Sequence, residues 1–180
     1  MSYLDFNLQQ YNRYTVLKPS VIQAIKNGSK LLSVGIGLGY YEEYLINTHG
    51  ISRSSIHCAD LHLDEKWSSH TSYIFDICSP WPNLNQKYDY ILFGQVIGVS
   101  AINKGGKKSQ IMAEHVENVI SQAARWLDVG GEIIVFDTTI QTVPTQWHIQ
   151  QHELWETVAN AIGGTITGNE KEWCVVNISI

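Results

Sequence analysis

Short apolar runs alternate with segments of helical periodicity along most of this sequence. The apolar runs that we expect to form strands lie at 30–34, 54–60, 71–76, 87–93 and 132–136. The segments with apolar residues at helical spacing lie at 21–26, 40–46, 110–126 and 154–162. An alternation of strands and helices predicts a parallel sheet that is covered by helices on both faces.

The end of the chain departs from this alternation. Two apolar runs, 165–167 and 173–180, are joined by the turn-like residues 168–171, which predicts a hairpin. The stretch 141–152 shows no clear period, and we expect it to be irregular. The sequence therefore predicts an α/β fold with a single doubly wound, mostly parallel seven-stranded sheet and an antiparallel terminal hairpin strand, in one domain that spans 1–180.

Three glycines at alternate positions, Gly35, Gly37 and Gly39, follow the first apolar run and precede a helical segment. We call residues 35–39 the glycine turn. Glycine has no Cβ and adopts positive φ, so a ligand can lie against the backbone and near the free N–H groups of the next helix. The dinucleotide pattern G-x-G-x-x-G requires its third glycine at Tyr40. Glu42 and Glu43 suit a helix start but repel a pyrophosphate, so we expect a nucleoside ligand without phosphates.

Composition limits the class of protein. The chain has 180 residues, 44% of them hydrophobic, and a net charge of −5, which suits one globular domain without a global basic field. Nucleic acid is therefore not an expected partner, although a local basic patch stays open. The three cysteines form no C-x-x-C pair, and the N-terminus has no signal layout. We expect a reduced, cytoplasmic protein without a membrane partner.

Acidic residues end two of the expected strands. Asp60 closes the run 54–60, and Asp76 closes the run 71–76. A carboxylate at the end of the strand next to the glycine turn can accept hydrogen bonds from both hydroxyls of a ribose. The alternative for Asp60 is a solvated loop aspartate.

These features together resemble the class I S-adenosylmethionine-dependent methyltransferases. The resemblance covers residues 20–180 and rests on the glycine turn, the two strand-end acids and the segment 127–133, which is similar to the family's Leu-Lys-Pro-Gly-Gly segment. The run 76–89 is similar to the family's acid, proline-containing loop and Phe-Asp entry into the fourth strand. The expected hairpin is similar to the family's last strand, which is antiparallel beside the sixth.

The resemblance implies that S-adenosylmethionine is the cofactor, and it assigns contacts to particular residues. The glycine turn would lie under the methionine part, Asp60 would hold the ribose hydroxyls, and Leu61 would lie against the adenine. Asp76 would accept from the adenine amino group, and the Ile77 backbone would contact the ring edge. Gln95, after the fourth strand, would lie beside the methyl donor.

Two departures from the family pattern bear on function. The family usually has an acid two positions before the first glycine, where this chain has Ser33, so the cofactor's ammonium group would lose a carboxylate partner. No Asn/Asp-Pro-Pro-Tyr segment follows the fourth strand, where residues 94–97 read Gly-Gln-Val-Ile. A base-amino methyltransferase of that type is therefore not expected, and a non-catalytic copy of the fold is an alternative.

The N-terminal segment 1–17 is polar and rich in aromatic residues. It either packs its tyrosines on the domain surface or closes over the ligand as a lid, in which Arg13 could pair with the cofactor carboxylate. Candidate general bases are Tyr11 and Tyr14 in this arm, and His148 and its neighbour His152 after the fifth strand. Each of them can also be purely structural, so the catalytic residue stays unknown.

Methyl transfer by in-line displacement, with the residues mainly positioning the reactants, is the leading prediction for this chain. The acceptor is expected to be a small molecule, contacted by the arm and by residues 98–109 and 138–152, since no substrate domain is inserted. The histidines show no ligand spacing, so no metal is predicted, and an oligomer stays open. The alternatives are a cofactor-binding or scaffold copy without turnover, and an NAD-dependent enzyme.

Overall fold

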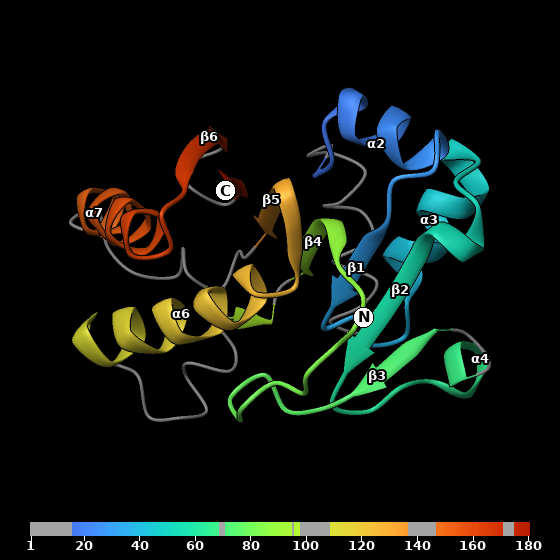
Figure 1. The fold of residues 1–180 in the computed structure, drawn as a ribbon, viewed down its shortest axis with the longest axis horizontal. Helices are drawn as coiled ribbons and strands as arrows, with labels where there is room; N and C mark the ends of the chain where they lie inside the picture. The colour runs from blue at the N-terminus through green and yellow to red at the C-terminus, as the bar shows by residue number, and fades with distance from the viewer. Residues whose placement is uncertain (1–15, 69–70, 95, 98–108, 137–146, 171–174) are drawn as a thin grey trace.

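A seven-stranded sheet with helices on both faces organises the structure, a computed structural model that describes residues 16–68, 71–94, 96–97, 109–136, 147–170 and 175–180 (Figure 1). The strands are β1 (Leu31–Val34), β2 (Ile56–Asp60), β3 (Ser72–Ile74), β4 (Tyr88–Gly94), β5 (Leu127–Phe136), β6 (Thr165–Glu170) and β7 (Val175–Ser179). The helices are α2 (Pro19–Lys26), α3 (Tyr40–His49), α4 (Glu65–Ser68), α6 (Ser109–Ala124) and α7 (Trp147–Ala161), with a short 3-10 helix at Arg53–Ser55.

The strand order is β3-β2-β1-β4-β5-β7-β6. The first five strands pair in parallel, whereas β7 lies antiparallel between β5 and β6. The predicted fold class, a mostly parallel seven-stranded sheet with an antiparallel hairpin strand, is confirmed.

Alternate residues along the strands enter two separate hydrophobic cores. On β1, Leu31 packs with α2 and α3, whereas Leu32 and Val34 pack with α6 and α7 on the opposite face. Figure 1 shows α3 beside β1 and β2 and α6 with α7 on the other side of the sheet. Because both faces are covered, the parallel strands are continuously apolar, which is why the runs were readable from the sequence.

The fifth strand begins earlier than predicted. We expected it to start at Glu132, with the preceding helix ending at 128–131, but Leu127 already pairs with Tyr88. The register then shifts so that Tyr90 pairs with Glu132, and residues 128–131 form an irregular bulge within β5. The pairing partner on β4, which local periodicity does not reveal, extends the strand.

Two further expectations near the C-terminus were wrong. The predicted hairpin turn at 168–171 overlaps β6, whose pairing with β7 continues through Gly168 and Glu170. The segment 141–152 was expected to be irregular, but α7 begins at Trp147 and therefore includes His148 and His152. In both places polar residues lie within a regular element, so the hydrophobic pattern did not reveal it.

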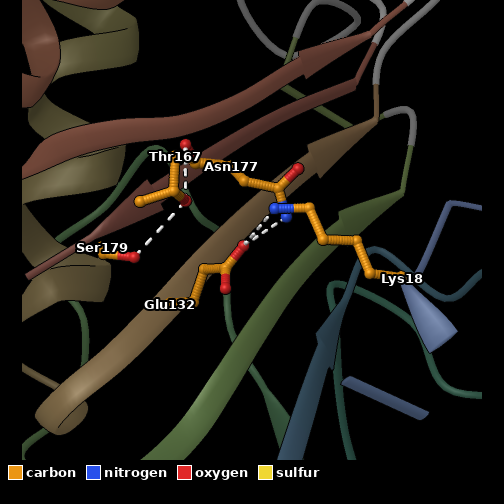
Figure 2. A network of polar contacts seen from close by, with 5 residues as sticks. All are labelled: Lys18, Glu132, Thr167, Asn177 and Ser179. Atoms are coloured by element: carbon orange, nitrogen blue, oxygen red, sulfur yellow. Dashed lines mark hydrogen bonds and ion pairs between the residues drawn. The ribbon is translucent and has the colours of Figure 1, made fainter. Parts of the chain in front are cut away.

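A polar network connects the segment before α2 to the strands β5, β7 and β6 (Figure 2). Lys18 Nζ lies 3.7 Å from Glu132 Oε1, which also accepts a hydrogen bond from the buried Asn177 side chain on β7. Thr167 donates to the Asn177 carbonyl at 3.5 Å, and Ser179 donates to Thr167 at 3.4 Å. The inserted strand β7 is thus held by polar contacts on one face, while Val176 and Ile178 pack into the core on the other.

Within the described parts of the chain, no helix has the length and apolar character required to cross a membrane.

Candidate functional site

The carboxyl ends of β1, β2 and β4 meet at one edge of the sheet. Val34 is level with Ala59 on β2 and with Phe93 on β4, so Gly35, Asp60 and Gly94 lie side by side. A backbone hydrogen bond of 2.8 Å from Gly35 N–H to the Ala59 carbonyl extends this pairing into the glycine turn. The predicted glycines and the first predicted acid are therefore brought together at the carboxyl ends of the strands, the usual ligand position in such sheets.

All three glycines of the turn have positive φ, with values of 77° at Gly35, 54° at Gly37 and 72° at Gly39. Gly39 is the N-cap residue of α3, and its N–H donates to the Ile36 carbonyl at 2.8 Å. Side chains other than glycine rarely adopt this conformation. The turn therefore places backbone without side chains, and the N-terminus of α3, at the carboxyl ends of the strands.

Two large side chains occupy the space in which Cβ atoms of the turn would lie. An ideal Cβ on Gly35 would be 2.5 Å from Val96 Cβ, and one on Gly39 would be 2.1 Å from Nε1 of the buried Trp67 on α4. Neither contact was anticipated, because Val96 and Trp67 carry no motif. They explain why glycine is needed at both positions for packing as well as for φ.

Asp60 bonds directly to the glycine turn. Its Oδ2 accepts a hydrogen bond from Gly37 N–H at 2.8 Å, and its Oδ1 accepts one from His62 N–H at 3.1 Å. Asp60 is therefore not a purely solvated loop aspartate, because its carboxylate accepts hydrogen bonds from two backbone N–H groups. A ribose contact would use the remaining lone pairs of the same carboxylate, and that assignment stays a prediction.

The other predicted contacts at the ends of β2 and β3 differ in burial. Asp76 is exposed two residues beyond β3, where its carboxylate accepts from Cys78 N–H at 2.8 Å and from the Ser79 hydroxyl at 3.3 Å. Leu61 is 53% exposed, so an adenine ring could cover it. Ile77 is buried, and its carbonyl accepts from Trp81 Nε1 at 3.1 Å.

Several predicted residues cannot be placed in the site. Tyr11, Arg13, Tyr14 and Gln95, and with them the arm or lid 1–17 except for its last two residues, lie outside the described residues. His148 lies in the first turn of α7, and its backbone alone is described. The candidate catalytic roles and the contacts of Arg13 and Gln95 stay predictions.

The helix that follows the glycine turn carries a buried acid. Glu42, in the first turn of α3, is 2% exposed, and its Oε1 accepts a hydrogen bond of 2.5 Å from the Ser33 hydroxyl on β1. Burial raises the pKa of Glu42 from 4.5 to about 7, and the charges of Asp60 and Glu43 add to the rise. The hydrogen bonds from Ser33 and from the Glu42 backbone N–H oppose it.

The two acids of this helical turn have different environments, which the sequence did not separate. Glu43 is half-buried and pairs with Lys66 Nζ at 2.7 Å, and the same ammonium lies 5.3 Å from the Tyr40 ring centroid. Glu42 instead points inward to Ser33. The sequence did contain a signal for this contact, namely a serine on a buried strand nine residues before a glutamate at a helix start.

Metal-ligating side chains do not gather in the described part of the chain: no three histidines, cysteines, aspartates or glutamates lie together in a way that could hold an ion.

The sheet order and the glycine turn define the fold of the class I S-adenosylmethionine-dependent methyltransferases, and solved structures with this fold match the chain. Streptomyces venezuelae DesVI matches with a TM-score of 0.62 at 12% identity, over 97% of this chain and 92% of that one. No protein-family model and no curated protein matches the sequence.

Two cofactor-bound structures are also similar. CalS10, an amino pentose methyltransferase from Micromonospora echinaspora, matches with a TM-score of 0.54 at 10% identity, over 99% of this chain and 92% of that one. The magnesium protoporphyrin IX methyltransferase ChlM from Synechocystis matches with a TM-score of 0.56 at 13% identity, over 99% and 84%. At these identities the shared property is the fold.

We predict that Gly39→Ala destabilises the protein more than Gly50→Ala. Both positions have positive φ, but a Cβ at Gly50 meets nothing within 4 Å, whereas one at Gly39 overlaps the fully buried Trp67. The overlap should add about 1–3 kcal/mol to the loss. Urea unfolding of both variants measures the difference, and equal losses would show that Trp67 yields without cost.

A second prediction concerns Glu42→Gln and pH. Because the folded-state pKa is raised to about 7, the folded protein binds this proton more tightly than the unfolded chain does. The native Glu42 therefore lowers stability as pH rises from 4.5 to 7, by up to about 3 kcal/mol, and Glu42→Gln should remove this loss. Urea unfolding between pH 5 and 8 measures it.

The matched control is Glu43→Gln, which removes a charge from the same helical turn at a half-exposed position. An equal change of pH dependence in Glu43→Gln would contradict the assignment to the buried carboxyl group.

Proposed function

We propose that this chain binds S-adenosylmethionine at the glycine turn and transfers its methyl group to a small-molecule acceptor by in-line displacement. The observation that carries the proposal is the hydrogen bond from Gly37 N–H to the Asp60 carboxylate. Gly37 belongs to a turn whose three glycines all have positive φ. Bare backbone, a helix start and an acid level with them fit an adenosyl ligand.

The described residues support cofactor binding by position and charge. Asp60 ends β2, and Asp76 lies two residues beyond β3, whose last residue Ile74 pairs with Asp60. They suit the ribose hydroxyls and the adenine amino group, with Leu61 against the ring. When bound, S-adenosylmethionine supplies an electrophilic methyl group, and the residues around it position the acceptor and exclude water.

The proposed acceptor class rests on the similar structures. CalS10 and ChlM act on an amino pentose and a porphyrin, respectively, so a small molecule is the acceptor class that we propose here. Acceptor contacts would come from the arm, from 98–109 and from 138–152. His148, Tyr14 and Tyr11 are the candidates for accepting a proton if the acceptor is a hydroxyl.

A non-catalytic, cofactor-binding copy of the fold is the second candidate. It is favoured by Ser33, which replaces the acid that the family usually has before the glycine turn. Cofactor binding without turnover on a panel of amine, hydroxyl and carbon acceptors would establish it. A cytoplasmic location, the absence of a nucleic-acid partner and the oligomeric state stay predictions.

We predict binding of S-adenosylhomocysteine and no binding of NAD. The glycine spacing places Tyr40 where the dinucleotide pattern requires its third glycine, and the two strand-end acids suit a nucleoside. Isothermal titration calorimetry with both ligands measures this. Heat from NAD together with none from S-adenosylhomocysteine or S-adenosylmethionine would overturn the proposal.

A further prediction concerns Asp60→Ala, which should weaken S-adenosylhomocysteine binding at least about tenfold. Charge-assisted hydrogen bonds to the ribose contribute about 1.5–3 kcal/mol each, and the Gly37 N–H would also lose its acceptor. Asp60→Asn keeps the shape and should give an intermediate loss. The control is Asp64→Ala, a nearby loop acid that accepts only from Lys66 N–H in the described contacts. Affinity of Asp60→Ala within twofold of the wild type would refute the ribose assignment.

A further inference from the structure

The carboxyl group of Glu42 is buried but only half satisfied. Its Oε1 accepts from the Ser33 hydroxyl at 2.5 Å. Its Oε2 is also buried, and among the described residues it has no hydrogen-bond partner. A buried carboxyl oxygen without a donor is unfavourable, so this atom is expected to have a partner when the protein acts.

This carboxyl group and its hydrogen-bond donor Ser33 come from the two elements that flank the glycine turn. Ser33 precedes Gly35 by two residues on β1, and Glu42 follows Gly39 by three residues on α3. Asp60, which accepts from Gly37 N–H, is close enough to influence the titration of Glu42. The acid therefore joins β1 to α3, the two elements that flank the glycine turn over which the ligand is proposed to bind.

We infer that Glu42 pairs with the ammonium group of the adenosyl ligand's methionine part, directly or through one water molecule, and that Ser33 is the positioning residue for Glu42. The inference rests on the proposed function, because it requires an adenosyl ligand over the glycine turn. An ammonium supplies the donors and the positive charge that Oε2 lacks. The helix thereby provides the negative charge that the first strand, with a serine, does not.

Proton release accompanies this pairing. The titratable groups that interact electrostatically with Glu42 are Tyr41 and Glu43 on α3 and Cys58 and Asp60 on β2, all of them acids. Burial and the negative charges of Asp60 and Glu43 keep part of the Glu42 population protonated near neutral pH. The ligand's ammonium stabilises the carboxylate, so the carboxyl proton leaves to the solvent while the ammonium keeps its own protons. Affinity should therefore rise between pH 6 and 8.

The test compares two ligands that differ in the amino-acid part. S-adenosylhomocysteine carries the ammonium, whereas 5′-methylthioadenosine keeps the adenosine and the thioether and lacks it. Titration calorimetry at pH 6, 7 and 8, in buffers of different ionisation enthalpy, reports affinity and proton release together. We expect proton release with S-adenosylhomocysteine and none with 5′-methylthioadenosine.

Glu42→Gln should weaken S-adenosylhomocysteine binding about tenfold or more and abolish its proton release. Its affinity for 5′-methylthioadenosine should stay within twofold, which also reports that the variant is folded. Glu43→Gln is the matched control and should retain both the affinity and the proton release. Ser33→Asp in the Glu42→Gln background places a carboxylate at the position of the Ser33 hydroxyl, 2.5 Å from the Glu42 side chain, and should recover affinity.

Unchanged S-adenosylhomocysteine affinity in Glu42→Gln, or an equal loss for both ligands, overturns the role of Glu42 and leaves the proposed function standing. Failure of the wild type to bind either ligand overturns the proposed function and this inference with it.

Discussion

The close approach of two side chains to the backbone of the glycine turn determines how β1 continues into α3. Val96 occupies the space beside Gly35, and Trp67 occupies the space beside Gly39. Since interiors are close-packed, neither position can accept a Cβ without displacing a neighbour. The turn is thereby held between the segment after β4 and the helix α4, with the Gly37 N–H directed to Asp60.

The same arrangement creates the unusual electrostatics of the site. The carboxyl groups of Asp60 and Glu42 belong to elements on either side of the glycine turn, and the charge of Asp60 contributes to the raised pKa of the buried Glu42. Asp60 accepts hydrogen bonds from two backbone N–H groups, while Glu42 accepts from the Ser33 hydroxyl and from its own backbone N–H and has a raised pKa. A carboxyl group that is only partly ionised, as in Glu42, is suited to a cationic group. The N-terminus of α3 is suited to polar oxygens.

The sheet explains why these groups meet although they are distant in sequence. Parallel strands β1, β2, β3 and β4 place their carboxyl ends at one edge, and helices on both faces bury β1 and most of β2 and β4. The antiparallel strand β7 and its polar network with Lys18 and Glu132 complete the sheet away from that edge (Figure 2). A fold of this kind does not by itself fix the acceptor, which we propose is chosen by the arm and by residues 98–109 and 138–152.

The sequence by itself determined the order of the strands and of the four longer helices, the glycine turn, and the acids at the end of β2 and shortly after β3. These features depend on residues that are neighbours along the chain: periodicity reports burial, and glycine reports positive φ. Only the tertiary structure decided the early start of β5, the helical state of His148, and the contacts of Val96, Trp67 and Glu42. Strand pairing, packing and the burial of a charge each depend on a partner from another element, and hydrophobic periodicity does not identify that partner.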